Sequence, residues 1–313
     1  MLDRITNAMQ VNNNLSHINS NLKRIQKTQE QIASGKTIRV PSDNPIGTTQ
    51  SMKINTALKK SVQFKKSLET GISYMENTSS LITQIEGVLL DIREIAENAV
   101  SVNTTSAERV AFAFEVNQLL EELVQLSNSK FQGKFIFGGT ETLSGTQANS
   151  SPFNIQLSGT AIASVIPNPD GIDGQIVRTV GEGKQITINI SGEDIFQPNG
   201  VNGEKDIFST IIDFREMLLA NNTSGYDQII RELDSEFNQV VSQNTIVGSK
   251  INRLQLVADQ LDDLEIIQKE QRSQIEDTDI AEAILELRTQ ETTLQAALET
   301  SGRILSLSLL DYI

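Results

Sequence analysis

The chain has 313 residues, a formal net charge of −14 and no cysteine or tryptophan. The lack of cysteine excludes disulfides, iron–sulfur clusters, cysteine-ligated zinc and a thiol nucleophile. The negative charge argues against nucleic acid as a partner, because the phosphate backbone would be repelled. No window approaches the roughly 20 apolar residues of a membrane span. The N-terminus lacks the apolar region of a Sec-type signal peptide. We therefore expect neither a membrane span nor such a signal peptide.

A heptad pattern runs through residues 8–32. Apolar residues spaced alternately three and four apart predict a long helix that packs as a coiled coil. The predicted N-terminal assembly seam consists of Ala8, Val11, Leu15, Ile18, Leu22, Ile25 and Ile32. Gln29 is the one polar interruption in this seam.

The stretch QIASGKTIRVPSDNPIG, residues 31–47, follows that helix. Its Gly-Lys pair is not part of a phosphate-binding loop, since such a loop needs an earlier glycine where Glu30 stands and a strand before it. The two prolines end the helix instead. The predicted helix break and cap consists of Pro41, Ser42, Asp43, Asn44 and Pro45. We expect Ser42 or Asp43 to cap the next helix, with Pro45 in its first turn.

The middle of the chain changes from helical to strand-like patterns. Helical periodicity covers residues 46 to about 100 and 105 to about 128, and Thr105 with Glu108 predicts a capping box. Twelve of the nineteen glycines then fall between residues 133 and 203. The segments FNIQLSG, GQIVRTV and KQITINISG alternate apolar and polar residues, as strands do. We therefore predict a small β-rich domain over residues 141–204, followed by further long helices.

The C-terminal segment repeats the heptad pattern of the N-terminal one. Its predicted assembly seam consists of Ile280, Ile284, Leu287, Leu294, Leu298 and Leu305, with Glu291 and Ser301 as interruptions. The last ten residues are so apolar that we expect them to be buried against another surface.

These elements predict a mainly α fold with a β-rich insert, in which long antiparallel terminal helices form a coiled coil or bundle. The predicted domains are three. Residues 1–40 and 275–313 form a terminal coiled-coil domain, residues 41–140 and 205–274 a helical rod, and residues 141–204 the inserted β-rich domain.

Charge is distributed unevenly along the chain. Residues 1–66 contain eleven Lys and Arg against three acidic residues, a net +8, whereas residues 261–313 contain four against twelve, a net −8. Opposite charges predict that the two segments lie beside each other, within one chain or between copies. The alternative is that the two segments are solvated helix faces whose opposite net charges are unrelated.

No pattern indicates catalysis or metal binding. A Ser-His-Asp triad would depend on His17, the only histidine, which lies on the predicted coiled-coil helix. Asp277, Asp279 and Glu282 fit a helix N-terminus, and the two carboxylates of NPDGIDG fit a turn rather than a calcium loop. We predict that the protein is not an enzyme and has no catalytic, metal or cofactor-binding residue.

Three blocks resemble the bacterial flagellin family of axial proteins. They are QEQIASGKTIRVPSDNPIGTTQS, SKFQGKFIFGGTET and IEDTDIAEAILELRTQETTLQAALETSGRILSLSLLDYI, which include both ends of the chain. Asn44 departs from the family pattern, which has a second Asp at that point. Within the family, the PSDNP and FIFGG passages and the final Asp311–Tyr312–Ile313 resemble the proteins that join hook to filament more than flagellin.

The resemblance implies a structural subunit secreted through the flagellar type III export channel, with an export chaperone as a partner. It implies a ring layer of self-associated copies at the hook–filament junction, between hook-associated protein 1 and flagellin. Because isolated helices are marginal in water, we expect residues 1–40 and 275–313 to be disordered in the monomer and to fold on assembly. The alternatives are flagellin itself and a coiled-coil binding module or adhesin.

Overall fold

The computed structural model describes residues 7–101, 103–140, 142, 151–168, 172–196 and 205–310, with backbone only at residues 7, 8, 10, 11 and 304–310. The chain divides into two compact units. Met1–Lys60 with Asp263–Ile313 form one, called the terminal unit, and Ser61–Asp262 form the other, called the central unit.

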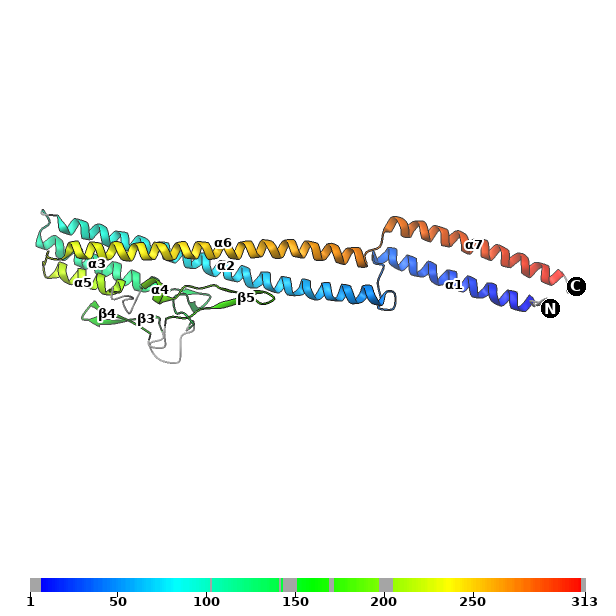
Figure 1. The fold of residues 1–313 in the computed structure, drawn as a ribbon, viewed down its shortest axis with the longest axis horizontal. Coiled ribbons are helices and arrows are strands. Elements are labelled where there is room, and N and C mark those ends of the chain that lie inside the picture. Colours follow the sequence, from blue (N-terminus) through cyan, green and yellow to red (C-terminus); the bar gives the residue numbers. More distant parts are fainter. Residues whose placement is uncertain are drawn as a thin grey trace. The chain divides into compact units, whose positions relative to one another are not determined.

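The described residues form long helices and three short hairpins (Figure 1). The helices are α1 (Asn7–Ser34), α2 (Pro45–Val100), α3 (Ser106–Ser127), α4 (Gly192–Phe196), α5 (Ile207–Leu219), α6 (Tyr226–Glu276) and α7 (Ile280–Leu310). The strands are β1 (Lys130–Phe131), β2 (Lys134–Phe135), β3 (Phe153–Ser158), β4 (Ala161–Pro167), β5 (Val177–Gly181) and β6 (Lys184–Thr187). The predicted fold class, mainly α with β structure in the middle, is confirmed.

Heptad spacing in α2 and α6 builds the core of the central unit. The buried apolar residues that recur every seven positions are Leu68, Met75, Ile82, Leu89 and Ala96 in α2, and Leu233, Val240, Val247 and Leu254 in α6. Residues seven apart lie on one face of a helix. The two helices therefore bury continuous stripes in one hydrophobic cluster, which α3 and α5 complete.

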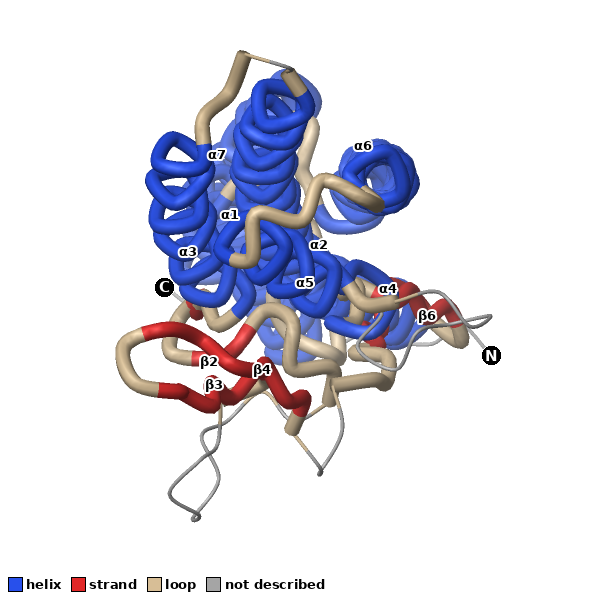
Figure 2. The backbone as a smooth tube through the Cα atoms, turned by 90° about the vertical axis from the view of Figure 1, so that its left-hand side faces the viewer, coloured by secondary structure: helices blue, strands red, loops and turns tan. Residues whose placement is uncertain are grey.

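The strands form three separate antiparallel pairs, β1–β2, β3–β4 and β5–β6. The β3–β4 hairpin packs beside α3 and α5 (Figure 2). An aromatic cluster links strands and helices. The Phe153 and Phe196 rings lie 4.9 Å apart, and the Phe196 and Phe208 rings 5.3 Å apart. The hairpins therefore share their core with the helices of the central unit.

This shared core differs from the predicted separate domain over residues 141–204. The three predicted strands correspond to β3, β5 and β6, but the structure also contains β4 and the β1–β2 hairpin. The segment AIASVIP of β4 has weak alternation, and each strand of β1–β2 has only two residues. Gln132 and Gly133 join β1 to β2 with φ values of 51° and 79°, as a two-residue hairpin turn of type I′ requires.

The FIFGG passage holds the hairpins to the helices. The Tyr74 hydroxyl of α2 donates a hydrogen bond to the Ile136 carbonyl at 2.9 Å. Gly139 has φ +57°, and a Cβ atom there would lie 1.7 Å from the Asp173 carbonyl oxygen. Only glycine permits this approach, so the passage has a packing role that explains its residue types.

The predicted capping box at the start of α3 is confirmed. Thr105 Oγ1 accepts a hydrogen bond from the Glu108 backbone N–H at 3.3 Å. The Glu108 carboxylate accepts one from the Thr105 backbone N–H at 2.6 Å. The hydrogen bonds from the Thr105 backbone and then its hydroxyl hold the pKa of Glu108 below its usual value.

Candidate functional site

Two connectors pair with each other in the terminal unit. Residues 35–44 join α1 to α2, and residues 277–279 join α6 to α7. The Thr37 N–H donates to the Glu276 carbonyl at 2.6 Å, and the Thr278 N–H donates to the Gly35 carbonyl at 2.9 Å. Gly35 has φ +67°, a conformation that glycine adopts without strain. The SGKT stretch is therefore one side of a backbone strap between the two connectors.

Glu276 is the charged centre of this strap. Its carboxylate lies 2.6 Å from Lys36 Nζ and accepts a second hydrogen bond from the Ser51 hydroxyl. Burial alone would raise the pKa of Glu276, but the hydrogen bonds from Lys36 and Ser51 outweigh it and lower the pKa. Glu276 is therefore ionised at neutral pH and connects α6 to both α2 and the first connector.

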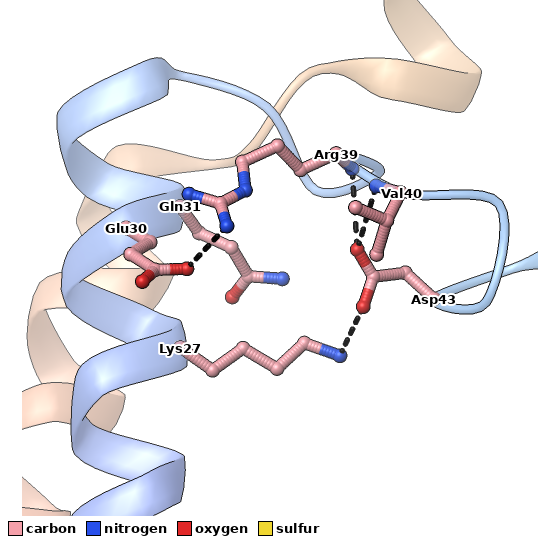
Figure 3. Close-up of a pocket in the computed structure, with 6 residues that line it drawn as sticks. All are labelled: Lys27, Glu30, Gln31, Arg39, Val40 and Asp43. Atoms are coloured by element: carbon pink, nitrogen blue, oxygen red, sulfur yellow. Dashed lines mark hydrogen bonds and ion pairs between the residues drawn. The ribbon is translucent and has the colours of Figure 1, made fainter.

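The first connector folds over the end of α1 and forms a small polar pocket of about 220 Å³ (Figure 3). Lys27 Nζ lies 3.0 Å from Asp43 Oδ1, and Arg39 Nη2 lies 3.0 Å from Glu30 Oε2. Gln31 lies between these two pairs in Figure 3. Each of the four charges has an opposite partner, so the pocket has no charge left over for a ligand.

Asp43 has a different role from the predicted one. Its Oδ2 accepts hydrogen bonds from the Arg39 and Val40 N–H groups at 3.2 and 3.1 Å, within the connector. The Lys27 side chain and then these backbone groups hold its pKa below the usual value. The cap of α2 is Asn44, whose Oδ1 accepts from the Gly47 N–H at 2.9 Å. The sequence predicts Ser42 or Asp43 instead, because it does not show which of three adjacent capping residues meets the helix.

The helix break itself lies at the predicted place. Helix α1 ends at Ser34, and α2 begins at Pro45. Pro41 and Ser42 are exposed residues of the connector between them. Pro45 occupies the first helical position, where its missing N–H has no partner to lose.

Helices α1 and α7 lie side by side and antiparallel in the terminal unit (Figure 1). Apart from Glu30 and Gln31, which line the connector pocket, the positions of α1 that are buried or half-buried are Asn14, Ile18, Asn21, Ile25, Thr28 and Ile32. Those of α7 are Ala283, Leu287, Gln290, Leu294, Ala297 and Ser301. Both sets follow heptad spacing, and Thr28 Oγ1 donates a hydrogen bond to Gln290 Oε1 at 3.2 Å between them.

The contact face includes only part of each predicted seam. Ile18, Ile25, Ile32, Leu287 and Leu294 point toward the partner helix, as the burial pattern shows. The predicted seam residues that remain exposed are Leu15, Leu22, Ile280, Ile284 and Leu298. The side chains of Ala8, Val11 and Leu305 lie outside the described residues.

The exposed seam residues of α1 lie next to its contact face. At about 100° per residue, Leu15 and Asn21 lie about 60° to either side of Ile18. Asn21 lies in the contact face together with Ile18, whereas the side that carries Leu15 and Leu22 stays open: Leu15 is 52% exposed and Leu22 47%. These exposed apolar residues are therefore available to contact another surface, as residues of an assembly seam must be.

Sequence reasoning missed the polar residues at these contacts. Asn21 and Thr28 are buried, and Arg272 Nη1 donates to Asn55 Oδ1 at 3.0 Å between α6 and α2. The signal that could have indicated the first two is their own seven-residue recurrence, Asn14, Asn21 and Thr28. Polar residues at a seam specify register and orientation at a cost in stability.

The opposite charges of the two segments do meet within one chain. Lys36 pairs with Glu276 in the terminal unit, and Lys65 pairs with Asp262 at 2.6 Å in the central unit. Both pairs join the basic segment of residues 1–66 to the acidic segment of residues 261–313. These exposed or half-exposed pairs support the register more than the stability.

The residues considered for other chemistry have structural surroundings. His17 is exposed on α1. Asp279 caps α7, since its Oδ1 accepts from the Ala281 and Glu282 N–H groups at 2.9 and 3.2 Å. Asp170 lies outside the described residues. The described ranges contain no group of three His, Asp or Glu side chains that could hold a metal ion. No helix within them is long and apolar enough to cross a membrane.

Comparison with known proteins identifies the family. The model of the bacterial flagellin N-terminal helical region matches residues 5–142, and that of the C-terminal helical region matches residues 230–313. Flagellar hook-associated protein 3 of Salmonella typhimurium is 23% identical over 318 aligned residues, covering 98% of each chain. A flagellin of Bacillus subtilis is 24% identical over 305 residues, covering 94% of this chain and 93% of its own.

The fold is similar to that of a solved relative. The crystal structure of flagellar hook-associated protein 3 from Legionella pneumophila, 14% identical, aligns with a TM-score of 0.62. It covers 72% of this chain and 98% of its own. The two family-model matches, residues 5–142 and 230–313, include both paired connectors and the terminal helices described above. The chain belongs to the bacterial flagellin family.

Proposed function

We propose that the protein is a structural axial subunit of the bacterial flagellum that joins the hook to the filament, and that it is not an enzyme. The observation that carries the proposal is the terminal helix pair, in which part of each predicted apolar seam, Leu15, Leu22, Ile280, Ile284 and Leu298, remains exposed beside the contact face. In a family of flagellar subunits, such helices are suited to packing against neighbouring subunits. The end-to-end similarity to hook-associated protein 3 favours the junction over the filament.

The partners follow from that position. Copies of the chain form a ring layer that contacts hook-associated protein 1 on one side and flagellin on the other. The subunit reaches the cell exterior through the flagellar export channel with the help of an export chaperone. Assembly supplies the apolar surface that the exposed seam residues lack, and each Leu or Ile buried there contributes about 1.5–3 kcal/mol.

Flagellin is the second candidate, because a Bacillus subtilis flagellin matches at nearly the same identity and coverage. Deleting the gene separates the two functions. Bare hooks seen by electron microscopy, together with flagellin lost into the medium, would support the junction protein. Loss of flagellin from both cells and medium would identify the filament subunit, and attached filaments would contradict both.

A seam variant tests how the protein assembles. Replacing Leu294 and Leu298 with Asp should abolish incorporation at the base of the filament, because charges cannot be buried in an apolar seam. Leu157→Asp is the matched control, since Leu157 is an exposed leucine of the central unit. Circular dichroism should show a folded central unit in both variants. Normal motility of the double variant would refute the seam.

A further inference from the structure

The central unit contains a second pocket, of about 340 Å³, between α2 and two of the hairpins. Tyr74 and Phe131 form one wall with their rings 5.8 Å apart and nearly perpendicular. Ile176 and Ile188 add apolar surface. The hydrogen bond from Tyr74 to the Ile136 carbonyl holds this wall in place, so the apolar part of the pocket is preformed.

The rim of this pocket is basic. Lys134 of β2 and Arg178 of β5 line it, and none of its described lining residues is acidic. Both side chains are exposed, and no ion pair in the described part of the chain involves either of them. The connector pocket differs, because its two cations are neutralised by Glu30 and Asp43.

These two cations, which form no ion pair with any described residue, make a local site of opposite sign in a chain of net charge −14. Arg and Lys recognise carboxylates through charge-assisted hydrogen bonds. Gln132 and Gln175 at the rim offer further donors, and the aromatic wall suits an apolar group. The geometry favours a ligand that carries a carboxylate beside an apolar body.

We propose that this pocket binds an acidic peptide segment of a second copy of the chain. The carboxylate of Asp or Glu pairs with Lys134 and Arg178, and the adjoining apolar side chain contacts Tyr74 and Phe131. Charge complementarity identifies this partner, since another copy has a net charge of −14 and offers exposed apolar and acidic neighbours such as Leu285 and Glu286 of α7. The choice of a second copy rests on the proposed function, in which copies stand next to each other in a layer.

The test titrates the purified full-length protein with acetyl-Leu-Glu-Leu-amide and follows binding by ligand-observed NMR. We expect binding that is at least fivefold weaker for the matched acetyl-Leu-Gln-Leu-amide and that weakens as salt is raised. Arg178→Gln should weaken binding at least fivefold. Lys184→Gln removes the same charge from the same hairpin, outside the pocket, and should leave binding unchanged. Equal binding by wild type and Arg178→Gln would overturn the proposal.

A second arm distinguishes the source of the carboxylate. Hexanoate also carries a carboxylate beside an apolar body, and we expect it to bind more weakly than the peptide because it lacks the backbone that reaches the glutamine rim. Hexanoate that binds as tightly as the peptide would overturn the peptide assignment. Bare hooks in the deletion strain combined with no peptide binding would refute the pocket while leaving the junction function intact.

Discussion

The two units of the molecule bury very different surfaces. Among the described residues, the largest fully buried side chains, from Tyr226 and Phe137 to Ile92, all belong to the central unit. Among the described residues of the terminal unit, only Ile25, Leu58 and Ala283 are buried hydrophobic residues. The central unit can therefore fold on its own core, whereas the terminal unit depends on another source of apolar contact.

Polar contacts supplement the few apolar contacts of the terminal unit. Examples are the hydrogen bond from Thr28 to Gln290, that from Arg272 to Asn55, and the pair of Lys36 with Glu276. Each such contact contributes only about 0.5–1.5 kcal/mol net, and an exposed ion pair contributes about 0–1 kcal/mol. A helix pair held in this way is specific in register but weak, which suits a segment that packs fully only in an assembly.

The strongest test of this comparison is in the aromatic cluster. Phe208→Ala should destabilise the central unit by about 3–5 kcal/mol, because it leaves a cavity among packed rings. Phe114→Ala is the matched control, since Phe114 is 68% exposed on α3, and it should change stability by less than about 0.5 kcal/mol. Urea unfolding followed by circular dichroism measures both. Equal effects would mean that the cluster is not the core.

Limited proteolysis compares the two units directly. Because the terminal unit lacks a core, we expect a protease to cleave within α1 and α7 of the monomer well before it cleaves α3 or α5. Mass spectrometry of the fragments should show a resistant product close to Ser61–Asp262. Terminal helices as resistant as the central unit would contradict coupled folding on assembly. Assembled material should protect the same bonds.

The sequence predicted the helices well, and their partners less well. Apolar heptads indicate that a helix face is buried, but not which surface buries it. Leu15 and Leu22 therefore belong to the predicted seam, although no described part of this chain covers them. The burial of Asn21 and Thr28 is not predicted from the sequence, because polar residues usually face solvent. Their contact with α7 arises from the tertiary pairing of the two helices, which local sequence propensity does not predict.

The same limit applies to the middle of the chain and to the connectors. Strand β4 was missed because its alternation is weak, and it forms through its pairing with β3. The sequence presents Glu276 only as one residue of an acidic segment, although Glu276 anchors the strap. Its role depends on Lys36, which is 240 residues away in the chain. Such long-range pairs leave no local pattern in a single sequence.

A substitution in the strap should have a smaller effect than one in the core. Gly35→Ala meets no atom within 4 Å, but it places a Cβ at φ +67°, which costs about 1 kcal/mol. We expect faster hydrogen exchange of the Thr37 and Thr278 amides, whose bonds define the strap, and unchanged exchange in α3. Gly248→Ala is the control, because Gly248 lies in a helix with open space around it. Unchanged exchange at both strap amides would show that the connectors do not depend on this turn.

The smallest expected effect is on the pH dependence of the strap's stability. We expect this effect in the terminal unit and not in the central unit. The pKa of Glu276 is lowered in the folded chain, so its contribution to stability is present above the ordinary pKa of 4.5 and is lost as pH falls through the lowered value. Exchange of the Thr37 amide, corrected for its intrinsic pH dependence, should therefore increase below about pH 4.5. Glu276→Gln should remove this response and leave the core amides of α3 unaffected. A response that persists in Glu276→Gln would assign it to another carboxyl, and the strap would then be held by its backbone hydrogen bonds alone.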